Sequence, residues 1–119
     1  MGNISQTLDE LMKLDGAVCG AVIDYNSGTT LGSFGSGIDL EVAAAGHTEM
    51  VRAQMKTVCA LGLCDTLDDI LITLHSQYHI IRPSAHAKGV FVYFVIDTKV
   101  GNLAMARRKV ANAERALQV

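Results

Sequence analysis

Residues 39–62 read DLEVAAAGHTEMVRAQMKTVCALG, a stretch without proline in which most residues favour helix. Asp39 can cap the start of this helix, and Gly62 stands where helices commonly end. The stretch therefore predicts one long helix. The distribution of side chains around it indicates how the rest of the chain is arranged.

At about 100° per residue, this helix has a narrow polar stripe and a much wider apolar or small surface. The stripe consists of Glu41, Thr48, Glu49, Arg52 and Lys56. The remainder divides into a bulky side, made of Leu40, Val51, Met55, Val58 and Leu61, and a small side, made of Val42, Gly46, Ala53, Thr57 and Ala60. So wide an apolar surface is more than one sheet can cover.

Bulky side chains fill the space above a sheet, whereas small ones allow a second helix to approach closely. We therefore expect the bulky side to cover this chain's own sheet. We expect the small side to meet another helix, namely the same helix of a second copy. The alternative, that the small side packs on the chain's own terminal helices, remains open at this point.

Length and composition limit the possible folds and functions further. The 119 residues fit one domain, residues 1–119, and half of them are apolar while 18% are charged. Ten Lys and Arg nearly balance twelve Asp and Glu, so the chain lacks the basic excess that nucleic acid requires. No apolar run is long enough for a membrane span.

The remaining elements follow from local patterns. A first helix begins at Asn3 or Ser5 and ends at Asp15-Gly16, and a last helix begins at Asn102. Strands are predicted at 17–24, 29–34, 67–75, 78–82 and 90–96. The last of these is apolar at every position, which indicates a central strand covered on both faces. The expected fold is α+β: a five-stranded antiparallel sheet with helices on both faces, in the order α-β-β-α-β-β-β-α.

The three cysteines, Cys19, Cys59 and Cys64, are an odd number, and the chain does not begin like a signal peptide. We expect a cytoplasmic protein with reduced thiols, and buried ones. Cys59 and Cys64 are too far apart in sequence for a Cys-x-x-Cys redox pair.

The spacing of residues along the sequence indicates which of them could form a catalytic or metal site. His75 and His79 are the one close pair of metal-ligand type; a two-residue turn at Ser76-Gln77 puts them on opposite faces, and a three-residue turn on the same face. Polar positions at a hairpin end explain them more simply. No nucleophile is paired with a base, and the glycines of 32–37 lack the lysine of a phosphate loop. We expect no enzyme activity, no metal and no cofactor.

Three further polar positions have simple interpretations. His47 lies between the bulky and small sides of the long helix, where it is either a hydrogen-bonded core residue or a pH-sensitive contact within a helix pair. Asp68 and Asp69 are adjacent, so their side chains point to opposite faces of a strand. The run from Arg107 to Lys109, together with Glu114 and Arg115, belongs mostly to the solvated face of the last helix.

The order of elements, with Gly16-Ala17-Val18, Asp24 before a glycine turn, and Gly101-Asn102-Leu103-Ala104-Met105-Ala106-Arg107 at the last helix, resembles the roadblock family of dynein-light-chain-like proteins. The resemblance covers almost the whole chain. It implies a roadblock/profilin-like domain that forms homodimers or heterodimers, in which the long helices pack together and the third strands pair. It also implies a scaffold or regulator of a small Ras-like GTPase, in bacteria and archaea one that controls polarity or motility.

Carried onto this chain, the resemblance implies a homodimer surface on the helix and on the strand from Asp69 to His75. Its residues are Val42, Gly46, Met50, Ala53, Thr57, Ala60, Asp69, Leu71, Thr73 and His75. The leading hypothesis is a non-enzymatic dimeric module that regulates or scaffolds a small GTPase. The alternative is a small-molecule sensor domain of similar architecture, its pocket lined by Met12, Phe34, Met50, Met55 and Phe91.

Overall fold

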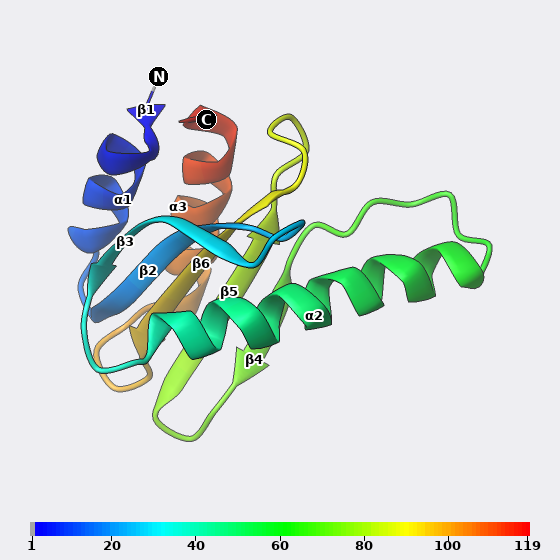
Figure 1. Cartoon of the computed structure of the whole chain (residues 1–119). Helices are drawn as coiled ribbons and strands as arrows, with labels where there is room; N and C mark the ends of the chain where they lie inside the picture. Colours follow the sequence, from blue (N-terminus) through cyan, green and yellow to red (C-terminus); the bar gives the residue numbers. More distant parts are fainter. Residues whose placement is uncertain (1) are drawn as a thin grey trace.

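A computed structural model describes residues 2–119 and contains the expected helices and sheet (Figure 1). The elements in chain order are β1 (Gly2–Asn3), α1 (Ile4–Met12), β2 (Ala17–Asp24), β3 (Thr29–Gly35), α2 (Leu40–Ala60), β4 (Ile70–Thr73), β5 (Gln77–Pro83), β6 (Val90–Asp97), α3 (Leu103–Ala116) and β7 (Leu117–Gln118). None of the helices within residues 2–119 is both long enough and apolar enough to cross a membrane.

The five longer strands form one antiparallel sheet in the order β3-β2-β6-β5-β4. The apolar strand β6 lies at its centre, as its composition predicted, and β3 and β4 form the two edges. The predicted α+β fold and its order of helices and strands are therefore confirmed.

Alternation along β6 supplies both halves of the core. Phe91, Tyr93 and Val95 belong to the cluster beneath α2. Val90, Val92, Phe94 and Ile96 belong to the cluster beneath α1 and α3, on the other face. Both sets are buried, so the sheet is covered on both sides, with α2 alone on one face and the two terminal helices side by side on the other (Figure 1).

The terminal helices begin where the sequence predicted. Asn3 caps α1 in a capping box with Gln6, and the Asn102 Oδ1 accepts the Met105 N–H at 3.0 Å. The parallel pair β1–β7, in which Gly2 lies opposite Leu117 and Asn3 opposite Gln118, was not predicted. Strands of two residues are too short for any periodic pattern to reveal.

The strand predicted at 67–75 is shorter in the structure, where β4 covers only Ile70–Thr73. Ile70 pairs with Ile81 of β5, so continuing the same register would place Asp68 opposite Pro83. Proline has no N–H to donate, which ends the ladder there. At the other end, Leu74 donates to the Gln77 carbonyl at 2.9 Å and starts the turn.

Candidate interaction surface

The small side of α2 is the most unusual surface of the molecule, because no part of the described chain covers it. Val42, Gly46, Ala53, Thr57 and Ala60 are all exposed, and Met50 is half-buried. A side chain added at Gly46 would meet nothing within 4 Å. Since α1 and α3 lie on the opposite face of the sheet, the idea that they cover the small side is wrong.

The sheet-facing side of α2 differs slightly from the predicted bulky side. Ala44, Thr48 and Val51 are buried, whereas Leu61 is 67% exposed. Thr48, which we assigned to the polar stripe, is thus part of the packed surface, and its hydroxyl finds no partner among the described residues. It lies at the border of the stripe, where a helical projection separates the two sides poorly.

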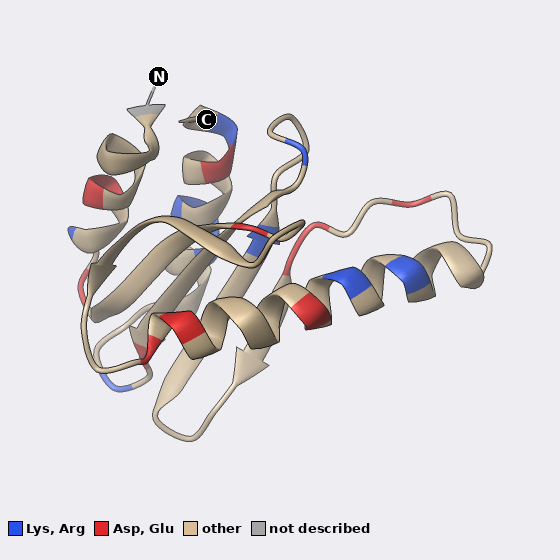
Figure 2. Ribbon diagram, viewed as in Figure 1, with Lys and Arg blue, Asp and Glu red and all other residues tan. Residues whose placement is uncertain are grey.

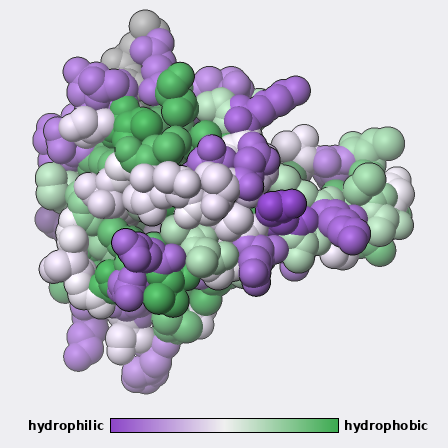
Figure 3. Space-filling model, in the orientation of Figure 1, coloured by the Kyte–Doolittle hydropathy of each residue, from purple (hydrophilic) through white to green (hydrophobic). Residues whose placement is uncertain are grey.

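The second half of α2 and residues 61–69 project beyond the body of the sheet (Figure 1). Residues 59–66 are all exposed, including Cys59 and Cys64. The prediction of buried thiols is therefore wrong for these two cysteines and right for Cys19. Leu61 and Leu63 are exposed at the end of this projection, and Figure 3 shows hydrophobic side chains gathered there.

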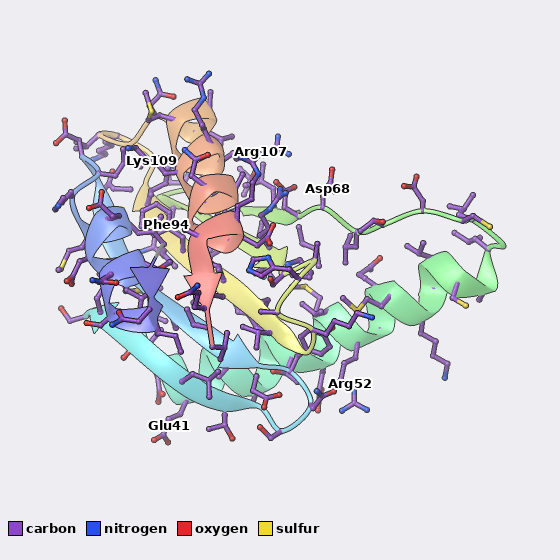
Figure 4. The ribbon with its side chains drawn as sticks, turned by 90° about the horizontal axis from the view of Figure 1, so that it is seen from above. Glu41, Arg52, Asp68, Phe94, Arg107 and Lys109 are labelled. Atoms are coloured by element: carbon purple, nitrogen blue, oxygen red, sulfur yellow. The ribbon has the colours of Figure 1, made fainter. Side chains whose placement is uncertain are left out.

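Charge is divided along the exposed part of α2 (Figure 2). The first half carries Glu41 and Glu49, and the second half carries Arg52 and Lys56; all four are exposed. Figure 4 shows Glu41 and Arg52 pointing away from the sheet. A helix with one acidic and one basic half is electrostatically complementary to an antiparallel copy of itself.

The edge strand β4 lies beside this surface. Its outer edge is unpaired within the described chain, and Leu71 and Thr73 are exposed. His75 is exposed in the turn that follows. Asp69 precedes the strand and is held by two Arg107 nitrogens at 3.0–3.1 Å, so it links this edge to α3. An open edge of this kind is a template for pairing with another chain.

A groove of about 490 Å³, here called the α2 groove, lies between the first half of α2 and the β4–β5 hairpin. Its lining residues are Ile38, Asp39, Val42, Ala43, Gly46, His47, Ile72, Leu74, His79 and Tyr93. Val42 and Gly46 belong to the small side of α2. The groove therefore opens next to the small side of the helix.

Three aromatic rings form the polar part of the α2 groove. The His47 ring lies 4.8 Å from the Tyr93 ring and 6.3 Å from the His79 ring, measured between centroids. The Tyr93 hydroxyl is 2.8 Å from the His79 Nδ1, and the His79 Nε2 is 3.0 Å from the Gln77 Oε1. Burial lowers the pKa of both histidines, and the nearby His47 lowers the pKa of His79 further. Burial also raises the pKa of Tyr93, with Cys19 adding to the effect.

The histidine pair considered for zinc does not converge. The turn is centred on His75 and Ser76, one residue earlier than predicted, and His79 lies opposite Ile72 on the face that α2 covers. His75 is exposed while His79 is 8% exposed. Within residues 2–119, no three His, Cys, Asp or Glu side chains are grouped in a way that could hold a metal ion.

The residues proposed for a sensor pocket are also separated by the fold. Phe34 packs in the cluster beneath α1 and α3, whereas Met50, Met55 and Phe91 belong to the cluster beneath α2. Met12 is 49% exposed on α1. These five side chains lie on different sides of the sheet, so they do not line one cavity.

Sequence reasoning missed a buried charged cluster around Glu114, which we placed on the solvated face of α3. Glu114 is only 3% exposed; it accepts hydrogen bonds from the Arg82 Nε, the Ser84 hydroxyl and the Ala85 N–H, at 3.1–3.3 Å. The His86 Nδ1 lies 3.2 Å from the same carboxylate. Burial raises the pKa of Glu114, but the hydrogen bonds from Arg82, Ala85 and Ser84 and the charge of Arg82 outweigh it, so the pKa lies below its ordinary value.

Known proteins resemble this chain in structure rather than in sequence. No protein-family model matches the sequence, and no curated protein is similar to it. MglB of Myxococcus xanthus superposes with a TM-score of 0.81 at 18% identity, over 94% of this chain and 89% of that one. A Roadblock/LC7 domain from Streptomyces avermitilis gives 0.82 at 10% identity, over 97% and 94%. The gliding protein MglB from Thermus thermophilus gives 0.73 at 14% identity, over 94% and 88%.

These structures share the element order and the sheet of this chain over nearly their full length. At identities of 10–18%, the superpositions establish the fold alone. The partners of each protein depend on its own surface. The chain has the roadblock fold, as the resemblance in its sequence predicted.

Proposed function

We propose that this protein is a dimeric, non-enzymatic interaction module that regulates or scaffolds a small Ras-like GTPase. The observation that carries the proposal is the small side of α2, which is exposed along the helix. A soluble domain rarely leaves an apolar or small surface of this extent uncovered unless it binds a partner. The fold shared with MglB and the family resemblance support the choice of a GTPase as a further partner.

A second copy of the chain fits the small side better than an unrelated helix does. The exposed positions Val42, Gly46, Ala53 and Ala60 follow one another at steps of four, seven and seven residues, so they form one line along α2. A two-fold axis near the middle of the helix would place the two lines against each other in antiparallel directions. The acidic half of each helix would then face the basic half of the other.

The same axis explains two further features. The first half of each α2, with its groove, would face the end of the other α2, where Leu61 and Leu63 are exposed. The apolar lining of the α2 groove, including Val42 and Ile72, offers these leucines a place to be buried. The β4 edges would approach each other, so that Leu71, Thr73 and the adjoining Asp69 and His75 lie at the junction between two sheets.

Light scattering after size-exclusion chromatography tests the dimer. We expect the mass of two copies for the wild type and of one copy for Ala53→Glu, because the added carboxylate would be buried between two helices at a cost of several kcal/mol. Ala104→Glu is the matched control, since Ala104 is exposed on α3, on the other face of the sheet. A monomeric wild type, or equal loss in both variants, would contradict the proposed surface.

The GTPase partnership needs a separate measurement. Ras-like GTPases encoded in the same genome can be loaded with GDP or a non-hydrolysable GTP analogue and titrated with the wild type and with Ala53→Glu. We expect nucleotide-dependent binding that requires the dimeric form, or a change in GTP hydrolysis rate. If none of these GTPases binds in either nucleotide state, the regulatory part of the proposal is wrong.

A further inference from the structure

The titratable rings of the α2 groove lie where the second copy would close it. His79 is 8% exposed, and His47 is half-buried on α2 between the sheet and the small side. Val42 and Gly46, on the proposed dimer surface, line the same groove. A second helix packed on those positions would remove the remaining contact between the His47 ring and water.

The hydrogen bonds around His79 fit a neutral imidazole. The Gln77 Oε1 accepts but cannot donate, so the His79 Nε2 at 3.0 Å carries a hydrogen. In the neutral ring the Nδ1 then accepts the Tyr93 hydroxyl hydrogen at 2.8 Å. A second proton, on Nδ1, would force Tyr93 to turn its hydroxyl hydrogen elsewhere. The Tyr93 oxygen would then accept from the Nδ1–H, so the network suits the neutral ring without rearrangement, and it is burial that disfavours the charged ring.

Within the described residues, no carboxylate forms an ion pair with His47 or His79 that would balance a positive charge. From α2, the one carboxylate lining the groove is Asp39, which already accepts the Glu41 and Val42 N–H groups and lies about 12 Å from His47 along the helix axis. From the sheet, Tyr93 of β6 and the Cys19 thiol of β2 face the cluster, and β4 contributes Ile72.

One more carboxylate lies at the end of β6. Asp97 is opposite Gln77 in the ladder and accepts the Lys99 N–H at 2.6 Å. Neither Asp39 nor Asp97 forms an ion pair with His47 or His79 in the described structure. An imidazolium in the closed groove would therefore be both buried and without a counter-ion, which is strongly unfavourable.

We propose that the dimer is proton-controlled: the second copy closes the α2 groove over neutral His47 and His79, and protonation of either ring drives the two copies apart. This inference rests on the proposed function, because it needs the second copy on the small side of α2. It adds control by pH to the dimer proposed on that surface.

The direction of the pH dependence follows from the coupling between proton binding and dimerisation. The pKa of each histidine is already lowered by burial in the single chain, and closing the groove would lower it further. The separate chain therefore binds protons that the dimer excludes. The dimer dissociation constant should be flat down to the ordinary histidine pKa of about 6.5 and should begin to rise only at a lower pH, where the separate chain takes up protons, by up to tenfold per pH unit for each proton excluded.

Sedimentation equilibrium between about pH 7.5 and pH 5.5 tests the inference, with near-ultraviolet circular dichroism to follow folding at each pH. We expect the wild-type dissociation constant to stay constant down to about pH 6.5 and to rise severalfold toward the acidic end of this range, as the lowered histidine pKa values of the separate chain are approached. His47→Phe keeps a ring against Tyr93 but cannot be protonated, and His79 remains, so the single variant should change the dependence and the double variant His47→Phe, His79→Gln should remove it. His86→Gln is the control, because His86 contacts Glu114 and Leu117 away from this surface and should leave the dependence unchanged.

The outcomes separate the two proposals. A dimer whose dissociation constant does not change with pH overturns proton control and leaves the dimer intact. A pH dependence that persists unchanged in the double variant, or dissociation that coincides with loss of the circular dichroism signal, also overturns it. A wild type that is monomeric at every pH overturns both.

Discussion

Single residues on α3 show how a charged side chain can be part of the core. Glu114 follows Ala113 on the buried side of the helix, and its carboxylate collects hydrogen bonds from the end of β5 and from the loop after it. The loop after β5 is thus fastened to α3 through one carboxylate. Such a group stabilises the fold only while it is ionised and fully paired.

Glu114→Gln should lower the free energy of unfolding by about 1.5–3 kcal/mol near neutral pH, the range for a hydrogen bond to a charged group. The Arg82 side chain is still 20% exposed, which keeps the loss below that of a fully buried pair. Because the pKa of Glu114 is lowered in the folded state, its contribution is present at neutral pH and is lost as the pH falls below the ordinary glutamate value.

Urea unfolding at neutral and acidic pH measures both effects. The wild type should lose more stability on acidification than Glu114→Gln does, and the two curves should converge at low pH. Glu10→Gln is the control, since Glu10 forms only an exposed pair with Lys13 at 3.0 Å. Equal stability of the wild type and Glu114→Gln at neutral pH would show that the buried cluster is not stabilising.

At the scale of elements, the projection of α2 beyond the sheet decides which thiols are accessible. Cys59 lies in the last turn of α2 and Cys64 lies in the loop that follows, where neither is covered by the described chain. Cys19, by contrast, lies in β2 beneath α2 and is fully buried. Burial raises the pKa of the Cys19 thiol to about 11, so its reactive thiolate form is scarce at neutral pH.

A disulfide reagent such as Ellman's should therefore modify two thiols quickly in the folded protein and the third only after unfolding. The double variant Cys59→Ser, Cys64→Ser should show no fast reaction but should release one thiol in denaturant. The expected cause is accessibility together with thiolate content. Fast modification of Cys19, or protection of Cys59 and Cys64, would show that α2 packs differently.

The sequence was informative where a pattern repeats along an element. The apolar run of β6 fixed the centre of the sheet, and the caps at Asn3 and Asn102 located two helix starts. The failures concern single tertiary contacts. Glu114 is buried only because Arg82 and the loop after β5 reach it, and that loop lies some thirty residues earlier in the chain. The end of β4 depends on Pro83 of a neighbouring strand, and the exposure of Cys59 depends on how far α2 extends beyond the sheet.

The candidate surface was predictable in part. The separation of small from bulky residues on α2 is visible in the sequence, and the structure leaves that small side uncovered. The groove with His47, His79 and Tyr93 was not predictable, because its rings come from a helix and two strands that only the fold brings together. Periodicity assigns a residue to a face, but it does not say which other element meets that face.

For the whole molecule, the strongest argument for self-association is the division of charge along α2. A two-fold axis near the middle of the helix would bring Glu49 of one copy close to Arg52 of the other, and each such contact occurs twice. Exposed pairs contribute about 0.2–1 kcal/mol each, and like charges placed together cost a similar amount. Twofold repetition makes the effect measurable in a dissociation constant.

Glu49→Arg alone should weaken the dimer, because two arginines of one copy would face two of the other, and Arg52→Glu alone should weaken it through repelling carboxylates. The double variant restores opposite charges and should recover most of the wild-type dissociation constant at low salt. Added salt should reduce all three differences, since exposed charges are screened.

Sedimentation equilibrium measures each dissociation constant, and the fold of each variant can be followed by its thermal unfolding. Recovery in the double variant would establish both the antiparallel direction and the register of the two helices. If the double variant is as weak as the sum of the single changes, the charged residues do not face each other and the two copies meet elsewhere.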